Sequence, residues 1–146
     1  MWAYKAVNTL DSMVGYQNKR FKEFGWASAK LDGLMNFLPS RISSILISIS
    51  SLIFRKYTFN SIKWAIRYFF SGTQNNSQLT EATMAGAIGI QLGGVNFYNS
   101  IPALRPYIGN AIHPLEIKYI KETIKIGYSC SALMMLVGIA FIWRGK

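Results

Sequence analysis

The chain has few of the residues that build disulfides or metal centres. Its 146 residues include one cysteine and one histidine, and only six are acidic. The single cysteine, Cys130, excludes an intramolecular disulfide and a metal site built on cysteine spacing. We interpret Cys130 as a small apolar side chain, because it lies inside an apolar segment. His113 stands alone and offers no ligand set.

Positive charge and apolar residues are abundant. Sixteen lysines and arginines give a net charge of +10, while 51% of the residues are apolar and 14% aromatic, with a mean hydropathy of +0.19. This composition favours a membrane protein over a soluble domain. The basic residues lie mostly beside the apolar segments, which suits lipid headgroups or an anionic substrate. No nucleic-acid motif accompanies them, so we expect no nucleic-acid partner.

The clearest apolar segment covers residues 126–143. It runs for eighteen residues without a charge, which is long enough for a helix that spans a bilayer. Tyr128 and Trp143 lie near its ends, where aromatic side chains anchor a helix at the membrane interface. The sequence therefore predicts a spanning helix here.

A second apolar segment covers residues 34–54 and is rich in serine. Ser44, Ser48 and Ser51 share one helical face, as polar contacts between packed membrane helices do. The alternating residues 47–50 also fit a half-buried strand. We favour a helix, because nothing else supplies partner strands and an open sheet edge cannot face lipid.

The segments between these two predict shorter elements. Residues 61–70 form an amphipathic helix, either in the membrane surface or packed on the protein itself, with an apolar face made of Ile62, Ala65, Ile66, Phe69 and Phe70. We expect an irregular connection over residues 95–113 and a short amphipathic helix over residues 114–125.

Residues 81–94 are rich in small side chains. Ala82 with Gly86, and Ala85 with Gly89, are pairs that let helices approach closely, and Gly93 with Gly94 ends the stretch. A phosphate-binding glycine loop is the alternative, but the spacing fits neither of the known glycine fingerprints. We therefore expect helix packing.

Together these segments predict an all-α integral membrane protein. We expect one membrane domain over residues 1–146, with about two spanning helices plus amphipathic or re-entrant helices. The predicted location is the cell membrane, which the chain crosses more than once.

Polar residues cluster just before the second apolar segment. Asn8, Asp11 and Ser12 lie on an amphipathic stretch, and Asp32 and Asn36 share one helical face four residues apart. Ser40 continues that face, with Pro39 and Arg41 beside it. Such groups are costly next to lipid unless they have a function. The sequence thus predicts a polar cluster at the mouth of a membrane segment.

Several long segments of the chain occur together in an order typical of one enzyme family. They are NTLDSMVGY, the basic pair Lys19 and Arg20, FGWASAKLD, NFLPSR, then Asn76 and Glu81 with MAGAIGIQLGG, and finally RPYIGN and LEIKYIK. In these segments the chain resembles the adenosylcobinamide-phosphate synthases of cobalamin biosynthesis. The chain departs from the family pattern at Asn75 and at Leu79-Thr80, where prolines are usual. It resembles the C-terminal half of a longer enzyme.

This resemblance implies an ATP-dependent, amide-forming ligase that joins aminopropanol phosphate to adenosylcobyric acid, with ATP and Mg²⁺ required. It also implies two further partners, the lipid bilayer and the N-terminal half of the enzyme or another membrane subunit. The implied catalytic carboxylates are Asp11, Asp32 and Glu81. The implied substrate-binding residues are Asn8, Ser12, Lys19, Arg20, Asn36, Arg41, Asn76 and Arg105.

Structural roles remain open for several of these residues. Lys19 and Arg20 are also typical of anchors beside a membrane, and Asp32 fits an ion pair with Arg41. Asn76 and Glu81 fit helix caps. For the whole chain, a non-catalytic membrane protein or subunit and a basic peripheral protein that binds anionic lipid or nucleic acid are the two alternatives.

Overall fold

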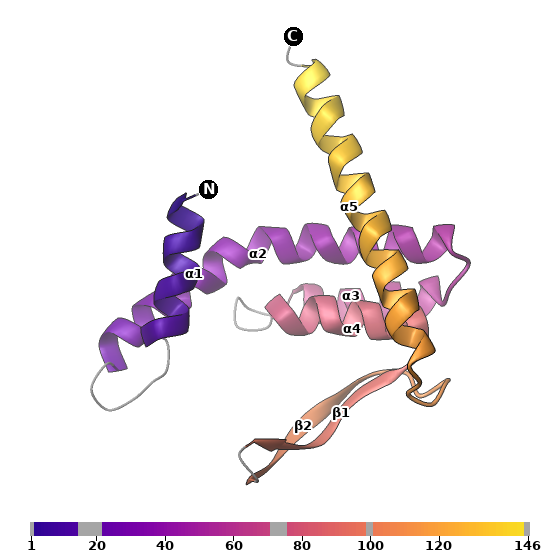
Figure 1. Ribbon diagram of the computed structural model, residues 1–146, viewed down its shortest axis with the longest axis horizontal. Coiled ribbons are helices and arrows are strands. Elements are labelled where there is room, and N and C mark those ends of the chain that lie inside the picture. The colour runs from indigo at the N-terminus through magenta and orange to yellow at the C-terminus, as the bar shows by residue number, and fades with distance from the viewer. Residues whose placement is uncertain (1, 15–21, 71–75, 99–100, 145–146) are drawn as a thin grey trace.

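The computed structural model describes residues 2–14, 22–70, 76–98 and 101–144 (Figure 1). At positions 3, 10, 11, 14, 22–25, 98 and 101 it describes the backbone alone. The elements in chain order are α1 (Trp2–Val14), α2 (Lys22–Ile53), α3 (Thr58–Phe69), α4 (Asn76–Ile88), β1 (Gln91–Tyr98), β2 (Ile101–Gly109) and α5 (Lys118–Arg144). The described part of the chain is therefore mostly helical.

Helix α2 is the element on which the others assemble. It is 32 residues long and contacts α1, α3, α4 and α5. In Figure 1, α1 lies against its first part, α3 and α4 lie alongside its later part, and α5 crosses it near its end. The predicted helix at residues 34–54 is confirmed, and the alternative strand at residues 47–50 is wrong.

The serines of α2 join it to α3. The Ser48 and Ser61 hydroxyls lie 3.1 Å apart, and Ser51 donates to the Thr58 hydroxyl over 3.2 Å. Ser61 in turn donates to the carbonyl of Thr83 in α4 over 3.1 Å. Because small polar side chains let the backbones approach and then bond across the contact, the predicted polar helix packing is confirmed.

Helix α3 packs on the protein with a different face from the one predicted. Its buried residues are Ser61, Trp64 and Ala65, whereas Ile62 and Ile66 are exposed. The indole nitrogen of Trp64 donates to the Asn110 side chain over 2.6 Å. A serine and a tryptophan can be buried here because each has a polar partner, which hydrophobic periodicity does not reveal.

Helix α4 lies directly against α3 through small residues. Ala82 and Ala85 are buried, and a Cβ atom on Gly86 would lie 2.8 Å from the carbonyl oxygen of Asn60. The predicted role of this stretch in helix packing is confirmed. The helix ends at Ile88, however, so Gly89 lies just beyond it, and Gly93 and Gly94 belong to β1.

The prediction of an all-α fold is wrong at residues 91–109. Strands β1 and β2 pair antiparallel from Gln91 with Gly109 to Tyr98 with Ile101, where an irregular connection was expected. The register shifts between Leu92 and Gly94. Gly93, with φ +109°, permits this shift, since a Cβ atom there would collide with the carbonyl of Pro106.

Two prolines hid this hairpin from sequence analysis. Pro102 and Pro106 both lie in β2, and proline normally argues against a strand. In a sheet of two strands, both strands are edges, so a proline nitrogen can face away from the partner strand. The hairpin extends from the helical part of the molecule, as Figure 1 shows at its lower edge.

Helix α5 is continuous from Lys118 to Arg144, so the helix predicted over residues 114–125 begins only at Lys118 and continues into the predicted spanning segment. Tyr119 and Ile126 are its buried residues, and they pack with Ile47, Ile88 and Ile90. The C-terminal part of α5, beyond the residues that face α2, projects away from the other helices (Figure 1). Helices α2, over Trp26–Ile53, and α5 are long and apolar enough to cross a membrane.

Candidate functional site

The predicted polar cluster forms where α1 meets the first half of α2. The Asn8 amide donates to one carboxylate oxygen of Asp32 over 3.3 Å, and the Asn36 amide donates to the other over 2.9 Å. The Tyr4 hydroxyl donates to the Asn36 side-chain oxygen over 2.5 Å. These bonds fix the orientation of the Asp32 carboxylate, which still has lone pairs available for a proton or a ligand.

Arg41 lies nine residues beyond Asp32 in α2, about two and a half helical turns, and is 4% exposed. Its Nε and one terminal nitrogen donate to the carbonyl of Phe69, over 3.3 and 3.1 Å. The other terminal nitrogen donates to Ser40 and to the Asn76 side-chain oxygen. The guanidinium also lies 3.7 Å from the ring centre of Phe37. Arg41 therefore joins α2 to the end of α3 and the start of α4, and substrate binding by it stays a prediction.

Asn76 connects α4 to the same cluster. It is the first residue of α4, and its amide donates to the carbonyl of Gly33 over 2.7 Å while its oxygen accepts from Ser40 and Arg41. Its side chain therefore holds α4 against α2 and does not cap its own helix. The alternative ion pair of Asp32 with Arg41 is not among the ion pairs of the described residues.

Glu81 and Arg105 line a cavity of about 190 Å³ between α4 and the hairpin, which is the second candidate polar site. Gln78 and Asn96 contribute polar side chains to the same cavity. Glu81 lies within α4, beyond its first turn, so it is not a capping residue. The hairpin thus brings a carboxylate and a cation, 24 positions apart in the sequence, to one site.

Other predicted residues are placed less informatively. The Ser12 hydroxyl is exposed and donates to the carbonyl of Asn8 in its own helix over 2.8 Å. Asp11 lies in α1, but its side chain is not among the described groups, and Lys19 and Arg20 lie outside the described residues. Within the described part of the chain, no three His, Cys, Asp or Glu residues are grouped to hold a metal ion.

Sequence analysis missed some members of both sites. Tyr4 precedes Asn8 by one helical turn, so extending the pattern of Asn8 and Ser12 backwards by four residues would have found it. Gln78 and Asn96 carried no such signal, because their positions in the cavity depend on where the hairpin folds.

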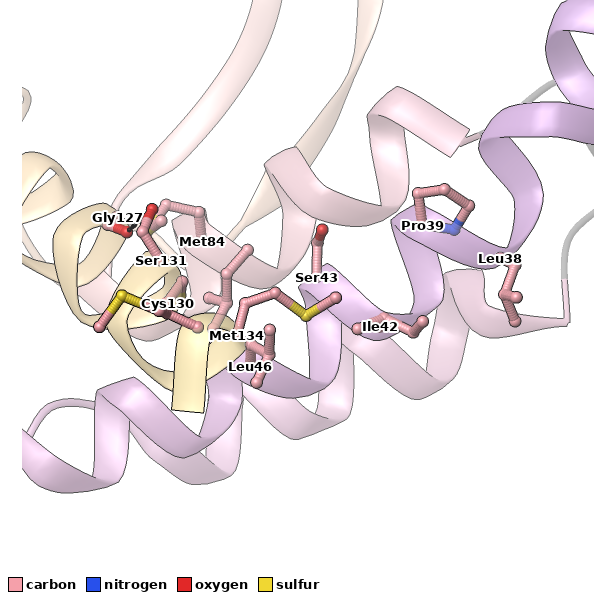
Figure 2. A pocket seen from close by; sticks show the side chains of 12 residues that line it. Leu38, Pro39, Ile42, Ser43, Leu46, Met84, Gly127, Cys130, Ser131 and Met134 are labelled. Carbon is pink, nitrogen blue, oxygen red and sulfur yellow. Dashed lines mark hydrogen bonds between the residues drawn. The ribbon is translucent and has the colours of Figure 1, made fainter. Parts of the chain in front are cut away.

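Another cavity, of about 660 Å³, lies between α2 and α5 and is apolar (Figure 2). Figure 2 shows Ile42, Leu46 and Met134 along it, with Cys130 and Ser131 from α5. The sulfur of Cys130 lies 3.3 Å from the Ser50 hydroxyl, which agrees with a role for this cysteine in helix packing. Among the described residues that line this cavity, none is charged.

The family model described as CobD/Cbib protein matches residues 1–127. The chain belongs to the CobD/CbiB family. The family predicted from the sequence segments is thereby confirmed. The matched residues include every candidate residue of both polar sites, while the last part of α5 lies beyond the match.

Individual members of the CobD/CbiB family are similar over nearly the whole chain. Cobalamin biosynthesis protein CobD of Geobacter metallireducens is 39% identical over 92% of this chain and 42% of that protein. CobD of Clostridium perfringens is 43% identical over 93% of this chain and 43% of that protein, and CbiB of Salmonella arizonae is 38% identical over 94% and 43%. The chain thus spans less than half the length of these relatives. No solved structure gives a significant match.

Proposed function

We propose that the chain is part of a membrane-bound adenosylcobinamide-phosphate synthase in cobalamin biosynthesis. The enzyme would join the amino group of aminopropanol phosphate to a carboxyl group of adenosylcobyric acid. Membership of the CobD/CbiB family and the names of the relatives support the pathway. The polar cluster at Asp32 supports the reaction, because amide formation needs a group that accepts a proton from the attacking amine.

The oriented carboxylate of Asp32 is the observation that carries the proposal. The side-chain amides of Asn8 and Asn36 donate to this carboxylate. Asp32 itself lies on α2, which is long and apolar enough to span a membrane. A carboxylate in such a helix is costly, and proteins keep one there mainly for function. We assign Asp32 as the proton acceptor, with Asn8 and Asn36 as the residues that position it.

Activation of the carboxyl substrate would use ATP with Mg²⁺. Magnesium that is held mainly by nucleotide phosphates needs only one or two protein carboxylates, so the described residues fit this ion although they form no three-ligand group. Because Asp32 is assigned as the proton acceptor, Glu81 is the candidate ligand, with Asp11 as a further carboxylate. The bound ion would neutralise phosphate charge. Arg105, Lys19 and Arg20 supply cations for phosphate or carboxylate oxygens, and Ser12 and Asn76 supply polar contacts.

Helices α2 and α5 support a location in the cell membrane, with more than one crossing. The chain covers only 42–44% of the length of these family members, so we propose that it acts with a further membrane segment equivalent to the rest of those proteins. The same length favours an alternative, in which the chain is a non-catalytic membrane subunit.

The test measures amide formation by the chain supplied with the remaining part of the Clostridium perfringens relative. Asp32→Asn keeps the shape of the side chain but removes its basicity, so we expect turnover to fall by about 10²–10⁴-fold. Product formation would be followed by mass spectrometry and divided by the amount of folded protein in detergent.

Glu116→Gln is the matched control, because it removes a carboxylate from an exposed position outside both polar sites. It should leave turnover unchanged. Full activity of the Asp32→Asn protein would remove Asp32 from the mechanism. If no combination of the two parts forms product while both are folded in the membrane, the non-catalytic alternative is the better account.

A further inference from the structure

A basic cavity lies beyond the C-terminal end of α2, away from both candidate polar sites. It measures about 370 Å³ and is lined by three cations, Arg55, Lys56 and Lys118, and by one carboxylate, Glu122. Rings of Tyr57, His113 and Tyr119 complete its wall. The turn between α2 and α3 forms one side, and the first turns of α5 form the other.

Contacts between these residues hold the cavity open in a defined shape. The Lys56 ammonium lies 2.8 Å from Glu122, which ties the turn to α5. The Tyr57 hydroxyl lies 2.9 Å from Nε2 of His113, whose ring stacks on Tyr119 with centroids 5.6 Å apart. Lys118 forms an ion pair with Glu116 over 2.8 Å. These are the two ion pairs among the described residues, and neither includes Arg55.

Arg55 occupies a position that normally belongs to glycine. Its φ is +51°, and no other non-glycine residue in the described part of the chain has a positive φ. The Lys56 amide donates to the Ser51 carbonyl and the Arg55 amide to the Leu52 carbonyl, which is the hydrogen-bond pattern of a Schellman helix end. Glycine adopts this conformation without strain and arginine does not. The arginine side chain therefore serves something other than the turn.

Two helices also begin at this cavity, and their ends add to its positive potential. Helix α3 begins after Tyr57, which makes no capping bond through its side chain, and α5 begins at Lys118. Neither helix has an acidic residue in its first turn. The N-terminal end of a helix carries partial positive charge and favours anions, so both ends reinforce the three cations.

We propose that this cavity binds a phosphate group, carried either by a phospholipid headgroup or by a soluble phosphate monoester. Arg55 donates two parallel hydrogen bonds to it, and Lys56 and Lys118 exchange part of their carboxylate contacts for phosphate oxygens. Helix α2 ends at Ile53 and helix α5 begins at Lys118, and both are long enough to span a membrane. The cavity therefore lies beside the ends of two candidate spanning helices, where a lipid headgroup and a soluble phosphate could both reach it. The site does not depend on the proposed amide-forming reaction.

The experiment compares the wild-type chain with Arg55→Gly, in detergent, by thermal unfolding with increasing inorganic phosphate against chloride at equal ionic strength. Glycine removes the guanidinium but suits a positive φ, so Arg55→Gly should unfold at the same or a higher temperature without phosphate. We expect phosphate to raise the unfolding temperature of the wild type, and to bind at least tenfold more weakly to Arg55→Gly. Arg55→Lys should retain part of the response, since it keeps the charge.

A second arm repeats the titration in nanodiscs of phosphatidylglycerol and of phosphatidylcholine. If phosphatidylglycerol suppresses the response to inorganic phosphate, the lipid headgroup occupies the cavity. If the response in both lipids is as large as in detergent, the site takes a soluble phosphate, and if both lipids suppress it, the headgroup phosphate of either lipid occupies the cavity. The proposal is overturned if phosphate has no effect on the wild type in detergent and in both lipids, or if Arg55→Gly responds as strongly as the wild type.

Discussion

At the scale of single residues, Arg41 shows how backbone and side-chain oxygens accommodate a buried cation. Its guanidinium donates to the carbonyl of Phe69 and to the side chains of Ser40 and Asn76, all from different parts of the fold. A planar group with five donors suits this geometry, and a lysine would not. The spacing of Asp32, Asn36 and Ser40 was readable from the sequence because one helix presents them, but the return of Asn76 to Arg41 was not.

Removing the Arg41 guanidinium should destabilise the fold. We expect Arg41→Met to lower the free energy of unfolding by about 2–4 kcal/mol, because partly buried oxygens of Asn76 and Phe69 lose a charged donor. Arg41→Lys should recover part of this loss. Unfolding would be measured in detergent by titration with sodium dodecyl sulfate.

The matched control for Arg41 is Arg67→Met. Arg67 is exposed and its guanidinium lies 5.0 Å from the ring centre of Trp64, so this change should cost less than about 1 kcal/mol. Equal losses in the two variants would contradict the structural role assigned to Arg41.

At the scale of elements, helix packing was predictable where small residues recur, and the hairpin was not. Ala82, Ala85 and Gly86 stand at helical spacing, which indicated a close helix contact that the structure confirms. Pro102 and Pro106 argued against strands, yet they lie in β2, whose pairing with β1 depends on contacts distant in sequence. The Glu81 and Arg105 cavity exists only because that hairpin folds next to α4.

Glycine-to-alanine changes distinguish Gly86, which lies at a close helix contact, from Gly138, which does not. In Gly86→Ala the new Cβ atom lies 2.8 Å from the carbonyl oxygen of Asn60, so α3 and α4 must move apart. We expect a loss of about 1–3 kcal/mol in unfolding free energy. In Gly138→Ala nothing lies within 4 Å of the new atom. Alanine should then be neutral or stabilising by up to about 1 kcal/mol, since it favours the helix. Indistinguishable unfolding of the two variants would refute the close contact.

At the scale of the whole molecule, α5 has little to pack against within the chain. Only 6% of the most apolar stretch of α5 is buried, whereas 39% of the most apolar stretch of α2 is buried. A helix that is apolar around its circumference requires an apolar environment. Lipid, or the further membrane segment proposed above, would supply it.

We therefore expect the chain to remain in membranes washed with alkaline carbonate. The spanning length of α5 is the reason, because about 20 apolar residues match the hydrocarbon thickness of a bilayer. Immunoblotting of pellet and supernatant gives the measurement. As a control, Leu136→Lys combined with Val137→Lys places two charges near the middle of α5, at a cost of about 2.5–3.5 kcal/mol each, and should increase release. Complete release of the unmodified chain would exclude a spanning α5.

The sequence by itself determined the features that depend on neighbours along the chain. The helices at α2 and α5 and the polar face at Asp32 follow from local spacing, because helical hydrogen bonds join residues four apart. The family follows from sequence segments that occur in the family's order. Tertiary structure alone decided which of these surfaces meet. The pairing of β1 with β2, the burial of Trp64 and the basic cavity at Arg55 each bring together distant segments. Their stability comes from contacts across the fold, which no local pattern encodes.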